Sequence, residues 1–232
     1  MMMQRAIMMR MSILITGAGG GLGRAVVEAF LAAGGTVYGV DMSWSKGNPH
    51  RSTNFHAIEA DVNTDEGCDT AVESSAPVNA LIHLVGGYAG GQSIADTDDA
   101  TFDRMINLNL RSAFRMIRAA LPGMQQAGKG RIVVIGSRAG DEPVAGSAAY
   151  NASKAALTAL VRAAALETRR SGVTVNLVAP STIDTPANRA AMPSAEFSRW
   201  VKPESIAKLL VWLASDAAAD ISGAAIPIYG GA

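Results

Sequence analysis

The sequence predicts a doubly wound α/β fold of the Rossmann type, with one domain built around a parallel sheet. Short, continuously apolar stretches recur along all 232 residues, and each is followed by a stretch with helical character. Five glycines lie in TGAGGGLG (residues 16–23), directly after the first apolar stretch, where such a sheet has its first strand-to-helix turn. No Pro/Ser-rich linker, low-complexity segment or repeat interrupts the alternation, which favours a single domain.

The elements follow from the alternation in order. The predicted strands are SILIT (12–16), TVYGVD (36–41), FHAIEAD (55–61), NALIHLV (79–85), RIVVIGS (131–137), VTVNLVAP (173–180) and AIPIY (225–229). Helices are predicted near 21–35, 64–75, 98–127, 147–171 and 203–215. The segment at about 184–202 breaks the pattern and is predicted to be a lid. Residues 1–11 are rich in methionine, lack the apolar core of a signal peptide, and are expected to form a flexible N-terminal extension before a domain at 12–232.

Composition favours a small-molecule ligand. Twenty basic and twenty acidic residues cancel, so charge gives no argument for nucleic acid or an anionic membrane. A single cysteine, Cys68, excludes an internal disulfide and fits a reducing cytoplasm. The three histidines are spaced unlike any metal-ligand pattern, so no metal is expected. No apolar run of 18 residues occurs.

The glycine loop predicts a phosphate site, because backbone N–H groups and a helix dipole attract phosphate where no Cβ blocks its approach. Asp41 ends the second strand 18 residues after Gly23, where a carboxylate accepts hydrogen bonds from an adenosine ribose. No Gly-Lys-Ser/Thr follows the loop, which disfavours a nucleotide triphosphatase. A tight turn without ligand, and a methyltransferase that uses S-adenosylmethionine, remain open at this point.

Residues in YNASK indicate the chemistry. Tyr150 and Lys154 are four apart at the start of a helix and share a face, so the ammonium is expected to lower the pKa of the phenol. Ser137 closes a strand thirteen residues earlier, at the carboxyl edge of the sheet. Asn109 is a polar residue in the middle of a long helix. A surface Tyr–Lys pair and a helix-internal Asn hydrogen bond are the alternatives.

Together these residues resemble the shorter branch of the short-chain dehydrogenase/reductase family, from about Ser12 onward. Thr16, Gly17, Gly21 and Gly23 meet its glycine pattern. The resemblance implies four catalytic residues, Asn109, Ser137, Tyr150 and Lys154. It also implies cofactor contacts from Gly17, Gly21, Leu22, Gly23, Asp41, Asp61, Val62, Tyr150, Lys154, Ile183 and Thr185.

The implied activity is hydride transfer between NAD(H) and a small carbonyl or alcohol substrate. Tyr150 would be the general acid–base, Ser137 would hold the substrate oxygen, and Lys154 would lower the pKa of Tyr150 and bind the nicotinamide ribose. Asn109 would anchor a water that links Lys154 to solvent. NAD is expected over NADP because Asp41 would repel a 2′-phosphate, although Lys46 and Arg51 lie nearby. The family's dimer helices imply a homodimer or homotetramer.

Two departures from the family pattern stand out. HLVG (83–86) replaces Asn-Asn-Ala-Gly, whose asparagine braces the sheet, and Ser181 stands where the family has glycine. The stretch VGGYAGG (85–91) is similar to dihydropteridine reductases of the same family, which lack the active-site serine. A reductase of that kind and a non-catalytic dinucleotide sensor are therefore the alternative functions. Packing of the lid against the body, or a modest apolar substrate pocket, is expected of Val144, Met192, Phe197, Trp200 and the glycine-rich stretch at 86–91.

Overall fold

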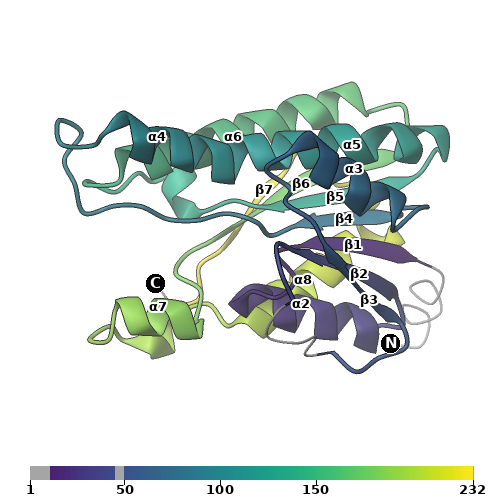
Figure 1. Ribbon diagram of the computed structural model, residues 1–232, viewed down its shortest axis with the longest axis horizontal. Helices are drawn as coiled ribbons and strands as arrows, with labels where there is room; N and C mark the ends of the chain where they lie inside the picture. The colour runs from purple at the N-terminus through teal and green to yellow at the C-terminus, as the bar shows by residue number, and fades with distance from the viewer. Residues whose placement is uncertain (1–10, 45–49, 232) are drawn as a thin grey trace.

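A seven-stranded parallel sheet with the order β3-β2-β1-β4-β5-β6-β7 forms the centre of the molecule (Figure 1). The computed structural model describes residues 11–44 and 50–231. The strands are β1 (Ser12–Thr16), β2 (Thr36–Asp41), β3 (Phe55–Glu59), β4 (Ala80–His83), β5 (Gly130–Ile135), β6 (Val173–Pro180) and β7 (Ala225–Ile228). The doubly wound fold predicted from the sequence is confirmed.

Helices cover both faces of the sheet. Figure 1 shows α2 (Gly21–Ala32) and α8 (Pro203–Leu213) on one face, and α3 (Asp65–Glu73), α4 (Asp99–Ile106), α5 (Ser112–Gln126) and α6 (Ala148–Glu167) on the other. Two separate apolar cores result, one around Phe30 and one around Met116. Every residue of β5 and β6 is buried, which explains why these strands are mainly apolar on both faces, although Arg131, Thr174 and Asn176 are buried with them.

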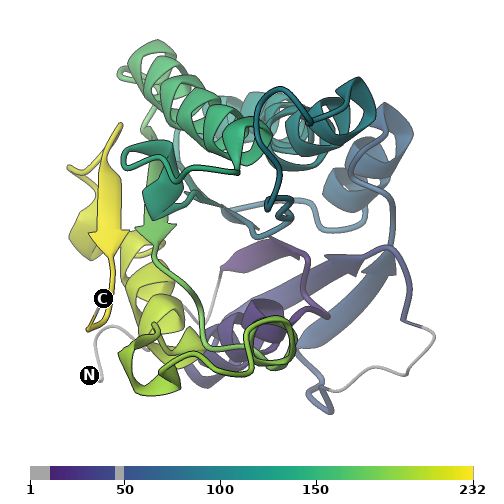
Figure 2. The same cartoon turned by 90° about the vertical axis from the view of Figure 1, so that its left-hand side faces the viewer.

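The strand order reverses at β1, and this places the site. β1 pairs with β2 on one side and with β4 on the other, so the loops after β1 and β4 leave the sheet toward opposite faces. Thr16 and His83 are register partners at the carboxyl ends of these strands. Ligands of open α/β sheets bind in the crevice at such a reversal. Figure 2 views the molecule from this end, with the segment after β6 in front.

The helix predicted over 98–127 is interrupted. A π-helical turn, Asn107–Arg111, separates α4 from α5 and contains the buried Asn109. Such turns often occur at functional sites, and hydrophobic periodicity does not reveal them. The helix predicted to reach 171 ends at Glu167, and the Thr168 hydroxyl donates to the carbonyl of Ala164.

The predicted lid contains structure of its own, α7 (Pro186–Ala191) and one 3₁₀ turn (Phe197–Arg199). Thr185 caps α7 by accepting a hydrogen bond from the Asn188 amide, and proline occupies the first helical position. Residues 1–10 of the expected N-terminal extension, and Lys46, lie outside the described residues.

Candidate active site

The glycine loop after β1 brings backbone N–H groups to the start of α2. Gly17 has a φ of +71°, a conformation that favours glycine. A Cβ on Gly23 would overlap the carbonyl oxygens of Gly17 and Ala18, so the close approach of loop and helix requires glycine there. Gly20, the residue before α2, has no side chain that could accept hydrogen bonds from the first amides of the helix. The first amides of the helix are therefore available to a phosphate.

The carboxylate of Asp41 contacts this loop, and that of Asp61 lies after the strand two places away in the sheet. Asp41 accepts hydrogen bonds from the amides of Gly19 and Met42, each at 2.9 Å. Each oxygen retains a lone pair, so the carboxylate can still accept from a ribose hydroxyl. Asp61, after β3, accepts from the backbone and side-chain nitrogens of Asn63. The side chain of Val62 is buried in the core behind it.

The lid begins against the glycine loop. A Cβ built on Gly21 would lie 3.0 Å from the Cβ of Thr185. Ile183 forms an isolated bridge with Val201, and its carbonyl accepts from Asn188 at 2.8 Å. Both ends of the lid are thus tied to the segment after β6, and Ile183 and Thr185 lie near the loop predicted to hold the dinucleotide.

Ser137 and Tyr150 meet at the carboxyl edge of the sheet. Ser137 follows β5 and caps a 3₁₀ turn, Arg138–Gly140, by accepting from the Ala139 amide at 3.2 Å. Tyr150 lies in the first turn of α6 and hydrogen-bonds with Ser137. Burial raises the pKa of Tyr150, the bond with Ser137 counteracts that rise, and the phenol of Tyr88 adds to it. The predicted lowering of the Tyr150 pKa is therefore wrong for this structure, because desolvation dominates.

Lys154 lies one helical turn after Tyr150, as the four-residue spacing predicts. Its Nζ atom is 6.0 Å from the centroid of the Tyr150 ring and donates to the carbonyl of Ile135 at 3.0 Å. Burial lowers the pKa of Lys154 to about 8. The carbonyl thus holds the ammonium at the edge of the site, where two of its three donors remain for other partners.

Asn109 fastens the loop after β4. Its Oδ1 atom accepts from the Gly87 amide at 2.9 Å, while Nδ2 donates to the Gly87 carbonyl at 3.0 Å and to Ser153 Oγ at 3.1 Å. A Cβ built on Gly86 would lie 2.8 Å from Asn109 Oδ1 and 3.3 Å from Lys154 Nζ. The side chain is therefore mainly occupied by backbone, yet its oxygen lies near the ammonium.

His83 occupies the position of the missing asparagine and forms a brace of its own. The ring is buried, with Nδ1 2.9 Å from Thr16 Oγ1 and Nε2 3.2 Å from Ser112 Oγ. Ser112 donates its only hydroxyl proton to the carbonyl of Leu108 at 2.7 Å, so Nε2–H must donate to Ser112. Nδ1 then accepts from Thr16. The neutral ring joins β1, β4 and the first residue of α5.

This brace predicts a pH-dependent stability. Burial, followed by the charge of Lys154, lowers the pKa of His83 from 6.5 to about 3. Below pH 6.5 the unfolded chain binds a proton that the folded chain does not, so stability falls as pH falls from 6.5 toward 3. Relative to His83→Asn, which cannot titrate, the wild type should lose about 2 kcal/mol between pH 6.5 and 4.5. Urea unfolding of both proteins measures this, and a constant difference across the range would contradict the assignment.

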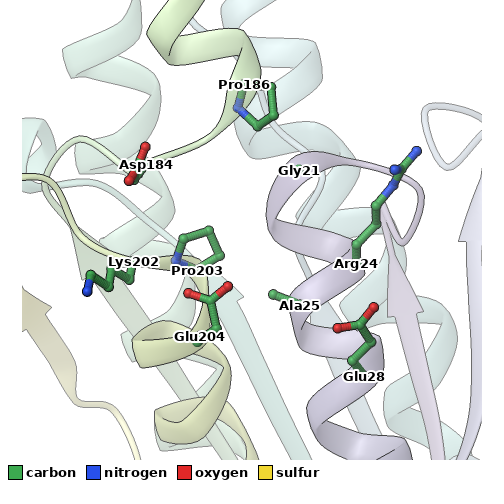
Figure 3. A pocket seen from close by; sticks show the side chains of 9 residues that line it. All are labelled: Gly21, Arg24, Ala25, Glu28, Asp184, Pro186, Lys202, Pro203 and Glu204. Carbon is green, nitrogen blue, oxygen red and sulfur yellow. The ribbon is translucent and has the colours of Figure 1, made fainter. Parts of the chain in front are cut away.

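One cavity lies next to the glycine loop, and another lies next to Ser137. The first, of about 350 Å³, lies between the starts of α2 and α8 and the lid, and Figure 3 shows its lining from all three. It shares Gly21 with the glycine loop and is otherwise lined mainly by charged side chains and prolines. The other, of about 490 Å³, is lined by Arg138, next to Ser137, by Trp200, and by four more residues: Ser181, Thr182, Glu196 and Arg199.

The predicted apolar pocket is assembled only in part. Trp200 lines the second cavity, but Phe197 packs on Trp200, with ring centroids 4.8 Å apart, and lies under the guanidinium of Arg189. Val144 and Met192 are exposed. Ser181, the second departure from the family, donates to the carbonyl of Tyr229 and so ties the segment after β6 to the segment after β7.

Sequence reasoning missed the roles of His83 and Tyr88. The signal for His83 was a polar residue that ends an apolar strand, but its two partners are 67 and 29 residues away in the chain. Tyr88 packs edge-on against Tyr150, at 5.0 Å between ring centroids.

Within residues 11–44 and 50–231, no cluster of three or more metal-ligating side chains occurs. In the same ranges no helix has both the length and the apolar character to span a membrane.

Known proteins resemble this chain over most of its length. The family model described as short chain dehydrogenase matches residues 11–195. The 3-oxoacyl-[acyl-carrier-protein] reductase MabA of Mycobacterium tuberculosis is 35% identical, over 95% of this chain and 92% of the relative. The 2-(S)-hydroxypropyl-CoM dehydrogenase 3 of Xanthobacter autotrophicus is also 35% identical, over 94% of this chain and 95% of the relative.

Solved structures are similar over nearly the whole chain. The 3-ketoacyl-(acyl-carrier-protein) reductase from Brucella melitensis complexed with NADH has a TM-score of 0.86 and 26% identity, and covers 96% of this chain and 98% of its own. ElxO with NADP bound has a TM-score of 0.88 and 27% identity, with coverage of 95% and 98%. Both forms of the nicotinamide cofactor therefore occur among similar structures.

Proposed function

Because the chain belongs to the short-chain dehydrogenase/reductase family and is an NAD(P)-dependent oxidoreductase, we propose that it transfers hydride between NAD(H) and a small carbonyl or alcohol substrate, with Tyr150 as general acid–base. One observation carries this proposal. Ser137, Tyr150 and Lys154 lie together where β5 ends and α6 begins, at the same carboxyl edge of the sheet as the glycine loop that can take a phosphate. Family membership also removes the methyltransferase alternative.

Each residue has a distinct task in the proposed mechanism. The nicotinamide, when bound, supplies or accepts the hydride. In reduction the Tyr150 hydroxyl donates its proton to the oxygen of the carbonyl being reduced, and in oxidation it accepts the proton of the alcohol. When substrate is bound, Ser137 donates its single hydroxyl proton to the same oxygen instead of to Tyr150 and stabilises the charge on that oxygen. Lys154 uses its remaining donors on the nicotinamide ribose.

Asn109 is proposed as both a brace and a relay position. Its oxygen keeps one lone pair after accepting from Gly87. Asn109 Oδ1 and Lys154 Nζ both approach Gly86, so one water can contact both and pass a proton between solvent and the ammonium, inward in reduction and outward in oxidation. This assignment rests on the proposed acid–base role of Tyr150, which needs its proton restored after each turnover.

We also propose the residues that hold the dinucleotide. Gly17, Gly21, Leu22 and Gly23 would bind the pyrophosphate through the amides at the start of α2. Asp41 would bind the adenosine ribose, and Asp61 with Val62 would lie against the adenine. Ile183 and Thr185, at the base of the lid over 184–202, would contact the nicotinamide, because Thr185 already lies beside Gly21.

NADH should bind more tightly than NADPH. The Asp41 carboxylate would repel a 2′-phosphate, and Ala18, Gly19 and Gly20 bring no compensating cation to the loop. Fluorescence titration of the purified protein with each cofactor measures the ratio of dissociation constants. Asp41→Asn keeps the size of the side chain and removes the charge, so it should bring the dissociation constants for NADPH and NADH closer together. Equal or tighter binding of NADPH by the wild type would overturn the prediction.

Assembly and location are further parts of the proposal. Phe102, Phe114 and Leu166 are exposed on α4, α5 and α6, which share one face of the sheet (Figure 1). Apolar side chains on one helical layer favour a homodimer, and two such pairs would give a homotetramer. Light scattering after gel filtration measures the assembly. The single cysteine, buried and free, fits a cytoplasmic protein.

Hydride transfer is tested by supplying NADH with a panel of ketones, and NAD with the matching alcohols, while the absorbance of the reduced nicotinamide is followed. Turnover of any substrate by the wild type supports the proposal. Binding of NADH without turnover of any member would favour the alternative of a non-catalytic dinucleotide sensor. Turnover restricted to a quinonoid dihydropterin would favour the dihydropteridine-reductase alternative.

A further inference from the structure

Tyr88 presents an open aromatic surface beside the proposed catalytic phenol. Its side chain is 65% exposed, and its ring lies 5.0 Å from that of Tyr150 at an interplanar angle of 77°. Most large aromatic side chains are at least half buried, since exposing the ring to water costs free energy. An open ring at this position indicates a surface that a ligand covers.

The exposed ring is held in place. Its hydroxyl lies 3.0 Å from Ser147 Oγ, three residues before Tyr150. A Cβ on Gly90 would overlap the Tyr88 hydroxyl, and the Gly91 amide donates to the Gly146 carbonyl at 2.7 Å. The loop after β4 is therefore fastened to the start of α6, and the ring keeps its orientation toward Tyr150 before any ligand arrives.

The reaction geometry places the substrate beside this ring. A reacting oxygen must lie about 2.6–3.2 Å from the Tyr150 hydroxyl to exchange a proton with it. A ring carried by the reacting carbon can then reach Tyr88, whose ring centroid lies 5.0 Å from that of Tyr150. Residues 84–91 bring no charged side chain, so this side of the site offers an aromatic face and glycine backbone.

We propose that Tyr88 contacts the substrate and selects ketones or secondary alcohols whose reacting carbon carries an aromatic or other planar conjugated ring. The proposal rests on the proposed hydride transfer at Tyr150. A planar ring can stack on, or point its edge at, the open face of Tyr88, with centroids 4.5–7 Å apart. A saturated ring of the same size gains contact area but lacks this geometry.

Two ketones of similar size test the selection, acetophenone and cyclohexyl methyl ketone. Tyr88→Leu removes the aromatic ring, and Tyr88→Phe keeps it while removing the bond to Ser147. For each protein, kcat/KM for acetophenone is divided by kcat/KM for cyclohexyl methyl ketone. The intrinsic reactivities of the two ketones then cancel when the wild type and the variants are compared. Tyr88→Leu should lower the ratio in favour of acetophenone about two- to tenfold, chiefly through KM, and Tyr88→Phe should retain it.

A binding measurement separates this proposal from the proposed function. Each ketone is titrated calorimetrically into protein loaded with oxidised NAD, which has no hydride to give. Acetophenone should bind about two- to tenfold more weakly to Tyr88→Leu than to the wild type, while cyclohexyl methyl ketone changes less. Equal losses for both ketones, no loss for either, or no binding of acetophenone to the wild type would overturn the proposal. A ketone that binds in this way but is never reduced with NADH would refute hydride transfer alone.

Discussion

Tyr150→Phe is expected to lower turnover by about 100- to 10,000-fold while leaving the affinity for NADH nearly unchanged. The substitution keeps the ring, its edge-on contact with Tyr88 and its place in α6, and removes only the hydroxyl that hydrogen-bonds with Ser137. Losing a positioned proton donor of this kind costs about 3–5 kcal/mol in the transition state. Steady-state rates and a cofactor titration on the same preparation measure both quantities.

The pH dependence of the wild type supplies a second check on Tyr150. Burial raises the pKa of its hydroxyl, so the deprotonated form needed for alcohol oxidation is scarce near neutral pH. The oxidative rate should therefore rise with pH from 6 to 9. The same pH profile is measured for Ser137→Ala, which leaves the Tyr150 phenol in place and removes the hydrogen bond that counteracts the rise in its pKa. Near-full turnover by Tyr150→Phe would refute the proposed mechanism, whatever the pH profile.

Lys154→Met is expected to impair both cofactor binding and turnover, unlike Tyr150→Phe. Methionine has nearly the same length and volume, so packing within α6 is kept while the ammonium is removed. Hydrogen bonds from a charged group typically contribute about 1.5–3 kcal/mol, which corresponds to NADH binding about ten- to a hundredfold weaker. Turnover should fall as well, because the variant lacks the ammonium proposed to hold the nicotinamide ribose beside Tyr150.

The fold should tolerate this substitution. Burial lowers the pKa of Lys154 to about 8, which means that keeping the charge inside the protein costs free energy. The melting temperature of Lys154→Met should therefore match or exceed that of the wild type. Lys208→Met, on the exposed side of α8, removes the same charge far from the proposed site and should leave binding and turnover unchanged. Unchanged NADH affinity in Lys154→Met would contradict its assignment to the ribose.

Local sequence was sufficient to predict the frame of the site. All seven strands lie where the sequence predicted them, because strands covered by helices on both faces are mainly apolar and stand out from the helical stretches between them. The i, i+4 spacing of Tyr150 and Lys154 placed both on one face of α6. The glycine loop was equally readable, since the contact between Gly23 and the Gly17 carbonyl spans only six residues.

Other features of the site depend on contacts between residues far apart in the chain, so only the tertiary structure decided them. The π-helical turn around Asn109 contacts the loop that contains Gly87, 22 residues away, and hydrophobic periodicity carries no trace of that contact. The rise in the Tyr150 pKa follows from burial by several elements, whereas the sequence suggested only the neighbouring charge of Lys154. The brace formed by His83 needs the alignment of β1 with β4 and the approach of Ser112. Local pattern thus determined which residues could meet, and packing determined their protonation and hydrogen-bond partners, because desolvation and long-range contacts exist only after the chain has folded.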